Sequence, residues 1–281
     1  MWSCVKLRAI QGIGQATARL FAKEGCRCIA IGDIKKHPIE ELKAEIEEKY
    51  SSTKVAAFEL DIGSEESVNS MMLSAARELG RIDYACNAAG ILLPGPTDEV
   101  SVASFDLQQR VNLRGTWLCQ RAQIKQMLQQ DHIKAEDNNF PARGSIANVA
   151  SMCALMAYDH LPAYTASKHA ILGFTRSDGL RYAKHGIRVN AICPGVIRTP
   201  ILSDVPNTDV GVDVQGMVSG MAAGRLGTPE EVAECLVWVT SGRASFVTAS
   251  TIAPNGGTLH EMNQTAFDVI KTDGYPGMIG A

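Results

Sequence analysis

The feature that most constrains the fold is a regular alternation between short apolar runs and amphipathic stretches of helical length. Apolar residues recur at three- and four-residue spacing between the runs, as at Ile39, Leu42 and Ile46. Gly25 and Gly80 stand where such helices would end in a left-handed residue. The runs of strand length are residues 28–31, 55–60, 82–86, 145–149, 187–193 and 250–253. Because parallel strands need a helical crossover, this order predicts a doubly wound α/β fold, a parallel sheet between two layers of helices.

The chain is long enough for one sizeable core. Its 281 residues are 46% hydrophobic and 20% charged, which excludes a disordered chain and a coiled coil. Polar segments near residues 129–144 and 207–215 interrupt the alternation without separating two cores. We therefore expect one domain over residues 1–260 and a C-terminal tail over residues 261–281.

Charge and cysteine usage limit the partners. The formal net charge is −3 and no long basic run occurs, so we expect no nucleic-acid partner. The eight cysteines form no C-x-x-C pair, which favours buried thiols in a reducing compartment, and no metal site is predicted. No leader segment and no apolar run of about 18 residues is found. We expect a cytoplasmic protein that does not associate with membranes.

A glycine-rich turn opens the first predicted helix. Gly12, Ile13 and Gly14 would bring backbone N–H groups close to a pyrophosphate, and Asp33 follows at the end of the next strand, where a carboxylate reaches ribose hydroxyls. Asp33 favours NAD(H), because the extra phosphate of NADP(H) would meet a like charge; NADP(H) is not excluded. A Gly-x-Gly turn is also typical of a helix start that merely packs closely, so this motif alone leaves both interpretations open.

Two further strand ends carry residues suited to a nucleotide. Asp61 and Ile62 follow the third strand, and Asn87, Ala88 and Gly90 follow the fourth, where small residues let the backbone lie flat under a ligand. An aspartate after a strand is also typical of a helix cap.

The residues of a proton transfer lie farther along. Tyr164 and Lys168 are four residues apart and share one helix face, and Ser151 follows a strand thirteen residues before Tyr164. Reducing a ketone by hydride leaves an alkoxide that needs a proton, and oxidising an alcohol needs the reverse. An ammonium about 5 Å away stabilises a phenolate by about 3 kcal/mol at an effective dielectric near 20. A tyrosine–lysine pair on a helix also occurs by chance, so its position near Ser151 carries the argument.

At these residues the sequence resembles the classical short-chain dehydrogenase/reductase family, from about residue 11 to residue 257. Further matching pieces are 111–115 (Val-Asn-Leu-Arg-Gly), Pro194-Gly195 with Thr199, and 224–233. The resemblance implies a Rossmann-like fold and a homodimer or homotetramer. It implies a catalytic tetrad of Asn112, Ser151, Tyr164 and Lys168, with Asn112 holding a water on a proton relay. Tyr164, Lys168, Pro194, Gly195, Val196, Ile197 and Thr199 would also contact the cofactor.

Three positions depart from the family pattern. The first strand of the family ends in Thr-Gly, whereas this chain has Leu7 and Arg8, with Lys6 in what is ordinarily a buried strand. We therefore expect a truncated or atypical first strand, and Arg8 would fill the pyrophosphate site or pair with it. Ala249 replaces an expected glycine before the last strand, a change that we expect to be tolerated.

These observations predict an NAD(P)-dependent oxidoreductase that interconverts a secondary alcohol and a ketone. Apolar residues within 200–223 are typical of a lid over an apolar small-molecule substrate, although an amphipathic helix pair would show the same pattern. Met156 and His160 are further candidates for substrate contact. The alternative is a protein of this fold that lost cofactor binding with its first strand and acts as a binding or structural subunit. Another reaction on the same scaffold, such as dehydration or epimerisation, is also open.

Overall fold

The computed structural model describes residues 3–7, 11–134, 141–203, 218 and 221–258. It contains a seven-stranded sheet of order β3-β2-β1-β4-β7-β8-β9, in which every neighbouring pair is parallel. The strands are β1 (Ser3–Leu7), β2 (Cys28–Asp33), β3 (Lys54–Glu59), β4 (Tyr84–Asn87), β7 (Gly144–Val149), β8 (Ile187–Ile192) and β9 (Thr251–Ile252). The strand order reverses between β1 and β4, which creates a crevice at the carboxyl ends of the strands.

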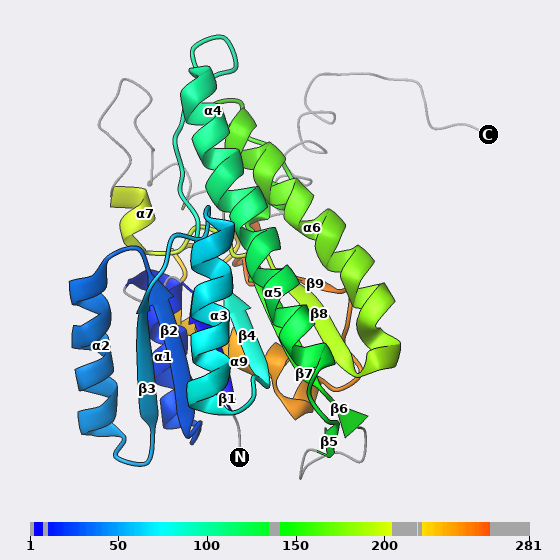
Figure 1. Ribbon diagram of the computed structural model, residues 1–281. Coiled ribbons are helices and arrows are strands. Elements are labelled where there is room, and N and C mark those ends of the chain that lie inside the picture. The colour runs from blue at the N-terminus through cyan, green and yellow to red at the C-terminus, as the bar shows by residue number, and fades with distance from the viewer. Residues whose placement is uncertain (1–2, 8–10, 135–140, 204–217, 219–220, 259–281) are drawn as a thin grey trace.

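Helices cover both faces of the sheet, as predicted (Figure 1). The helices are α1 (Gly12–Lys23), α2 (Lys36–Lys49), α3 (Glu65–Leu79), α4 (Val102–Gln108), α5 (Thr116–Leu128), α6 (Pro162–Tyr182), α7 (Pro200–Ser203) and α9 (Pro229–Thr240). One layer holds α1, α2 and α9, and the other holds α3, α5 and α6 (Figure 1). The predicted three-layer α/β/α fold is confirmed. No helix among the described residues is both long and apolar enough to span a bilayer.

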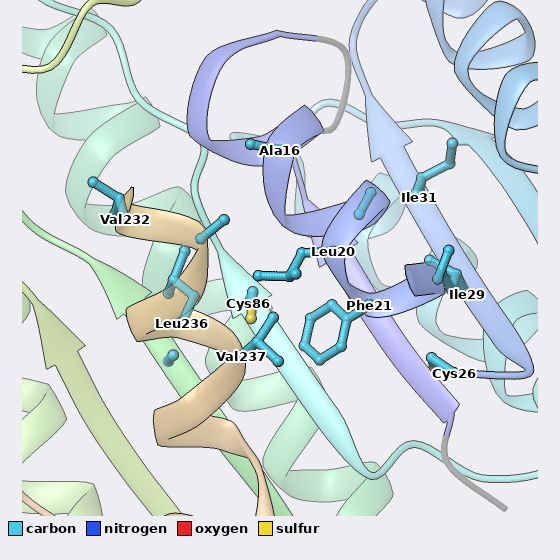
Figure 2. Close-up of a cluster of buried hydrophobic side chains, with 14 of the residues drawn as sticks. Ala16, Leu20, Phe21, Cys26, Ile29, Ile31, Cys86, Val232, Leu236 and Val237 are labelled. Carbon is cyan, nitrogen blue, oxygen red and sulfur yellow. The ribbon is translucent and has the colours of Figure 1, made fainter. Parts of the chain in front are cut away.

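The core between the sheet and the first helical layer fixes α1 against α9. Leu20 and Phe21 of α1 lie beside Leu236 and Val237 of α9, over Cys86 of β4 (Figure 2). Each fully buried side chain of this size contributes about 1.5–3 kcal/mol. This packing places the N-terminus of α1, with its glycine-rich turn, at the crevice.

The predicted helix ends are confirmed. Gly25 and Gly80 have φ angles of +85° and +76°, which only glycine adopts without strain. Thr228 and Glu231 form a reciprocal capping box at the start of α9: Thr228 Oγ1 accepts from the Glu231 N–H, and Glu231 Oε2 accepts from the Thr228 N–H.

The expectation of a truncated first strand is corrected. Strand β1 is present and pairs with both β2 and β4, so backbone hydrogen bonds hold it in the middle of the sheet whatever side chains it carries. The argument that this fold lost its first strand therefore does not hold. Arg8, the tail 261–281 and the lid residues 204–217 and 219–220 lie outside the described residues. The polar insertion after α5 includes an antiparallel pair, β5 (Ile133–Lys134) with β6 (Pro141–Ala142).

Candidate active site

A cavity of about 170 Å³ lies in the crevice at the carboxyl ends of the strands. Residues predicted from five separate segments of the chain meet at its wall. These are Gly12, Ile13, Gly14, Ala88, Gly90, Ser151, Tyr164, Lys168, Pro194, Gly195, Val196, Ile197 and Thr199. A parallel sheet explains the meeting, because the loops that follow its strands all lie at the same edge.

Tyr164 and Lys168 lie on the first turns of α6, and both are buried, with 8% and 3% of their surface exposed. Lys168 Nζ lies 5.5 Å from the centre of the Tyr164 ring and donates a hydrogen bond of 3.1 Å to the carbonyl of Val149, the last residue of β7. The end of a strand and one face of a helix together fix the ammonium next to the phenol.

Ser151 lies two residues beyond β7 and faces the same cavity. Its Oγ accepts a hydrogen bond of 3.1 Å from the backbone N–H of Cys153. This bond fixes the oxygen and leaves the hydroxyl proton for another acceptor, since a hydroxyl can donate once and accept twice. Burial raises the pKa of the Cys153 thiol, so that neighbour is neutral at pH 7.

Asn112 lies behind the cavity rather than on its wall. It is fully buried in a π-helical turn, Gln109–Gly115, that joins α4 to α5. Its amide accepts from the N–H of Ile91 at 2.8 Å and donates to the carbonyl of Ile91 at 2.9 Å. A Cβ built on Gly90 would lie 3.3 Å from both Asn112 Oδ1 and Lys168 Nζ. A side chain at position 90 would therefore crowd both groups.

Gln108 makes the same double hydrogen bond one helical turn earlier. Its amide accepts from the N–H of Leu93 and donates to the carbonyl of Leu93, both at 3.1 Å. Gln108 and Asn112 thus hold alternate residues of an extended segment, and Leu92 between them lines the cavity. Gln108 was not predicted from the sequence, where its only signal is a second amide residue four positions before Asn112.

Asp33 ends β2 and is 6% exposed. Its Oδ1 accepts from the N–H of Lys35 at 3.3 Å, whereas Oδ2 is buried and has no hydrogen-bond partner among the described residues. A buried carboxylate oxygen without a donor is costly, and ribose hydroxyls would satisfy it. This unpaired oxygen, together with the φ of +57° at Gly12, fits the binding of a dinucleotide.

The structure does not bring Asp33, Asp61, Ile62 or Asn87 to the cavity wall. Asp61 forms an ion pair with Arg110 at 3.0 Å and accepts from the N–H of Gly63. Ile62 is buried against Gly115. The Asn87 amide belongs to a buried network with Gln123 and Asn148, an arrangement that the sequence offered no way to foresee.

Eight cavity residues were predicted neither for the site nor for the lid. They are Gln11, Leu92, Val149, Ala150, Met152, Cys153, Tyr158 and Leu161, and most of them are apolar. Two predicted substrate contacts are not on the wall: Met156 packs behind it, and His160 pairs with Asp159 at 2.9 Å. Apolar residues in a loop carry no periodic signal, so their place on a cavity wall follows only from the fold.

Comparison with known proteins agrees with this architecture. The family model described as "Enoyl-(Acyl carrier protein) reductase" matches residues 9–259. The crystal structure of levodione reductase superimposes with a TM-score of 0.82 at 27% sequence identity, covering 91% of this chain and 96% of that one.

Curated relatives match over almost the whole chain. The short-chain dehydrogenase srdC of Neurospora crassa is 37% identical, over 88% of this chain and 93% of its own. A 2,5-dichloro-2,5-cyclohexadiene-1,4-diol dehydrogenase of Sphingobium indicum is 36% identical over 88% and 92%. The cis-4-hydroxycyclohexanecarboxylate dehydrogenase of Sinomonas cyclohexanicum is 34% identical over 89% and 93%. The chain belongs to the short-chain dehydrogenase/reductase family and is an oxidoreductase that acts on CH–OH groups.

Proposed function

We propose that the protein interconverts a secondary alcohol and a ketone on an apolar small molecule, with a nicotinamide dinucleotide as the redox partner. One observation carries the proposal: Ser151, Tyr164 and Lys168 meet on the wall of a cavity that also contains the glycine-rich turn at the start of α1. A proton-transfer group and a nucleotide-binding turn in one cavity are what this chemistry requires.

The chain's own residues handle the proton. Ser151 donates its free hydroxyl proton to the substrate oxygen and orients it, and the Tyr164 hydroxyl gives a proton to the developing alkoxide or takes one from the alcohol. Lys168 stabilises the phenolate that remains. Asn112 holds Ile91 in place, and it would hold a water on a proton relay to Lys168, as the family resemblance implies.

The cofactor would lie between the glycine-rich turn and β8. Gly12, Ile13 and Gly14 would hold its pyrophosphate, Asp33 its adenosine ribose, and residues 194–199 its nicotinamide end, with Ala88 and Gly90 below it. The bound nicotinamide supplies or accepts the hydride. The unpaired Oδ2 of Asp33 supports NAD(H), while NADP(H) stays open. Asp61, Ile62 and Asn87 remain candidates only for contacts outside the cavity.

The substrate side of the cavity supports an apolar, alicyclic alcohol. Leu92, Met152, Leu161 and Val196 are apolar residues of its wall. Two of the relatives are named for substrates built on a six-membered carbon ring that carries a hydroxyl group. We therefore infer that this chain acts on cyclic secondary alcohols or the corresponding ketones. We also expect a cytoplasmic homodimer or homotetramer, as the family resemblance implies.

Binding and turnover test the proposal together. Purified protein is titrated with NADH and NADPH while its melting temperature is followed, and cyclohexanol with NAD is then assayed for NADH formation. Nucleotide at 100 times its Kd adds about 2.7 kcal/mol to the free energy of unfolding, a shift that is easily measured. We expect a larger shift with NADH than with NADPH. The absence of a shift with either nucleotide would contradict the proposal.

A further inference from the structure

One polar group in the substrate half of the cavity has no role in the proton transfer described above. Tyr158 lies in the loop between Ser151 and α6 and lines the cavity with Leu92, Leu161 and Tyr164. It packs against the buried apolar cluster that contains Met152 and Val196. Its hydroxyl is a polar group in a wall that is mostly apolar.

The Tyr158 hydroxyl lacks a good acceptor. Its one hydrogen bond within the described part of the chain goes to the thioether sulfur of Met152, at 3.7 Å. A thioether is a weak acceptor, so most of the donor strength of the phenol is unused. Burial raises the pKa of Tyr158, so its hydroxyl stays protonated at physiological pH. A hydrogen bond from this hydroxyl to an oxygen acceptor would therefore be favourable.

The loop holds this donor in place before any ligand arrives. The Leu161 N–H donates to the Tyr158 carbonyl at 3.1 Å, and the Gly95 N–H donates to the carbonyl of His160 at 2.8 Å. The His160 ring lies 6.0 Å from the Tyr158 ring on the other side. A donor whose backbone is fixed in this way loses little conformational entropy on binding, which is what a specificity contact needs.

We propose that Tyr158 is a specificity-determining residue whose hydroxyl donates a hydrogen bond to a second oxygen of the substrate, at a distance from the reacting carbon. The inference rests on the proposed function and narrows its substrate class to cyclic secondary alcohols or ketones with a second hydroxyl, carbonyl or carboxylate oxygen. Two relatives are named for compounds of this kind, a 1,4-diol and a 4-hydroxy carboxylate.

The loss of kcat/KM that follows removal of the Tyr158 hydroxyl depends on the charge of the second substrate oxygen. A hydrogen bond to a neutral oxygen corresponds to a loss of about threefold to tenfold in kcat/KM when the donor is removed. A hydrogen bond to a carboxylate corresponds to about tenfold to 100-fold. Ring compounds that lack the second oxygen should be insensitive to Tyr158.

The experiment compares three alcohols in Tyr158→Phe and in the wild-type protein, with NAD in excess. The alcohols are cyclohexanol, 1,4-cyclohexanediol and 4-hydroxycyclohexanecarboxylate. We expect kcat/KM of the variant to fall about threefold to tenfold for the diol, further for the carboxylate, and less than twofold for cyclohexanol. Tyr182→Phe, at the far end of α6 and away from the cavity wall, is the matched control and should change none of the three.

The outcomes separate the two proposals. Equal losses for all three alcohols, or no loss for any, would overturn the role of Tyr158 while leaving the dehydrogenase activity in place. If the wild-type protein turns over none of the alcohols and binds neither nucleotide, the proposed function fails and this inference fails with it. A melting temperature of Tyr158→Phe within about 2 °C of wild type shows that the variant is folded.

Discussion

Asp33 is the residue on which the proposed preference for NAD(H) is based. Its carboxylate is buried at the end of β2 and has one oxygen without a donor. Two ribose hydroxyls would satisfy that oxygen, whereas a 2′-phosphate would bring a second negative charge next to it. The proposed preference for NAD(H) thus rests on one side chain.

We predict that Asp33→Ala weakens NADH binding about tenfold to 100-fold, the range for a lost hydrogen bond to a charged group. Binding of NADPH should become tighter, because the like charge is gone. Fluorescence titration of both nucleotides measures the change, with the exposed Asp106→Ala as a control. An unchanged ratio of the two Kd values would show that Asp33 does not contact the ribose.

Ala249 shows why the family resemblance leads one to expect glycine before the last strand. Its φ is +56°, and it is the one non-glycine residue of positive φ within the described ranges. A side chain in this conformation costs about 1–2 kcal/mol. Ala249 also lies against Gly179 of α6. A Cβ added to Gly179 would lie 2.7 Å from the Cα of Ala249. The substitution is tolerated, but at a cost in stability.

Ala249→Gly should therefore stabilise the protein. Relief of the strain exceeds the added entropy of glycine in the unfolded chain by about 0.5–1 kcal/mol. The midpoint of thermal unfolding should rise by about 1–4 °C. A lower midpoint would mean that the backbone at this position is not strained.

Among the elements, the helix that runs from α4 through the π turn to α5 shapes the substrate side of the cavity. Gln108 and Asn112 on this helix hold Leu93 and Ile91 by paired hydrogen bonds, and Leu92 between them faces the cavity. The wall at Leu92 thus depends on side-chain amides rather than on a neighbouring strand.

Gln108→Met keeps the volume of the side chain and removes both hydrogen bonds to Leu93. The two backbone groups would stay buried and unpaired, which costs about 2 kcal/mol or more in the free energy of unfolding. We expect the KM for a cyclic alcohol to rise severalfold, with the Kd of NADH unchanged within twofold. The exposed Gln129→Met is the control. Equal loss of alcohol and nucleotide binding would indicate a general structural defect.

The contribution of the start of α9 to the stability of the fold depends on pH, and the sign of this dependence follows from the pKa of Glu231. The Arg225 guanidinium and the Thr228 N–H lower the pKa of Glu231 to about 2, from an ordinary value of 4.5. A carboxylate with a lowered folded-state pKa stabilises the fold above pH 4.5, and this contribution is lost as the pH falls from 4.5 toward 2.

Glu231→Gln should therefore lower the melting temperature at pH 7, and the gap to wild type should narrow below pH 4.5. Glu230→Gln, beside it in the first turn of α9 but outside the capping box, is the matched control. Thermal unfolding measured at intervals between pH 7 and pH 3.5 gives the comparison. A gap that is constant over this range would show that the charge of Glu231 contributes nothing to stability.

The elements could be predicted because their signals are local. The three- and four-residue spacing at Ile39, Leu42 and Ile46 and the capping box at Thr228 identify helices α2 and α9 without tertiary information. The π turn around Asn112 carries no such signal, because its widened hydrogen-bond ladder depends on the segment that Asn112 holds. The sequence of strand β1 led us to expect a truncated or atypical strand. The strand nevertheless forms, because it pairs with β2 on one side and with β4 on the other.

At the scale of the whole molecule, the point where the strand order reverses determines which predicted residues meet. Tyr164, Lys168 and Ser151 were predictable as a set, because Ser151 comes two residues after a strand and the tyrosine–lysine pair lies on the helix that follows. Asn87 was predicted at the same edge, yet its amide is used in a buried network between β4, β7 and α5. Such networks depend on contacts between segments that are far apart in the sequence, and so do the positions of cavity-wall residues such as Leu92 and Tyr158. These features could therefore not be predicted from local sequence patterns.

The measurement that tests the account most directly is turnover of a responsive cyclic alcohol by Tyr164→Phe, together with the Kd of NADH. Removal of one hydroxyl leaves the packing of α6 intact, and Tyr182→Phe on the same helix serves as the control. The account predicts that kcat falls by about 10²- to 10⁴-fold, the usual contribution of a general acid or base, while the Kd of NADH stays within about twofold. Turnover close to the wild-type rate would contradict the assignment of the proton transfer to Tyr164.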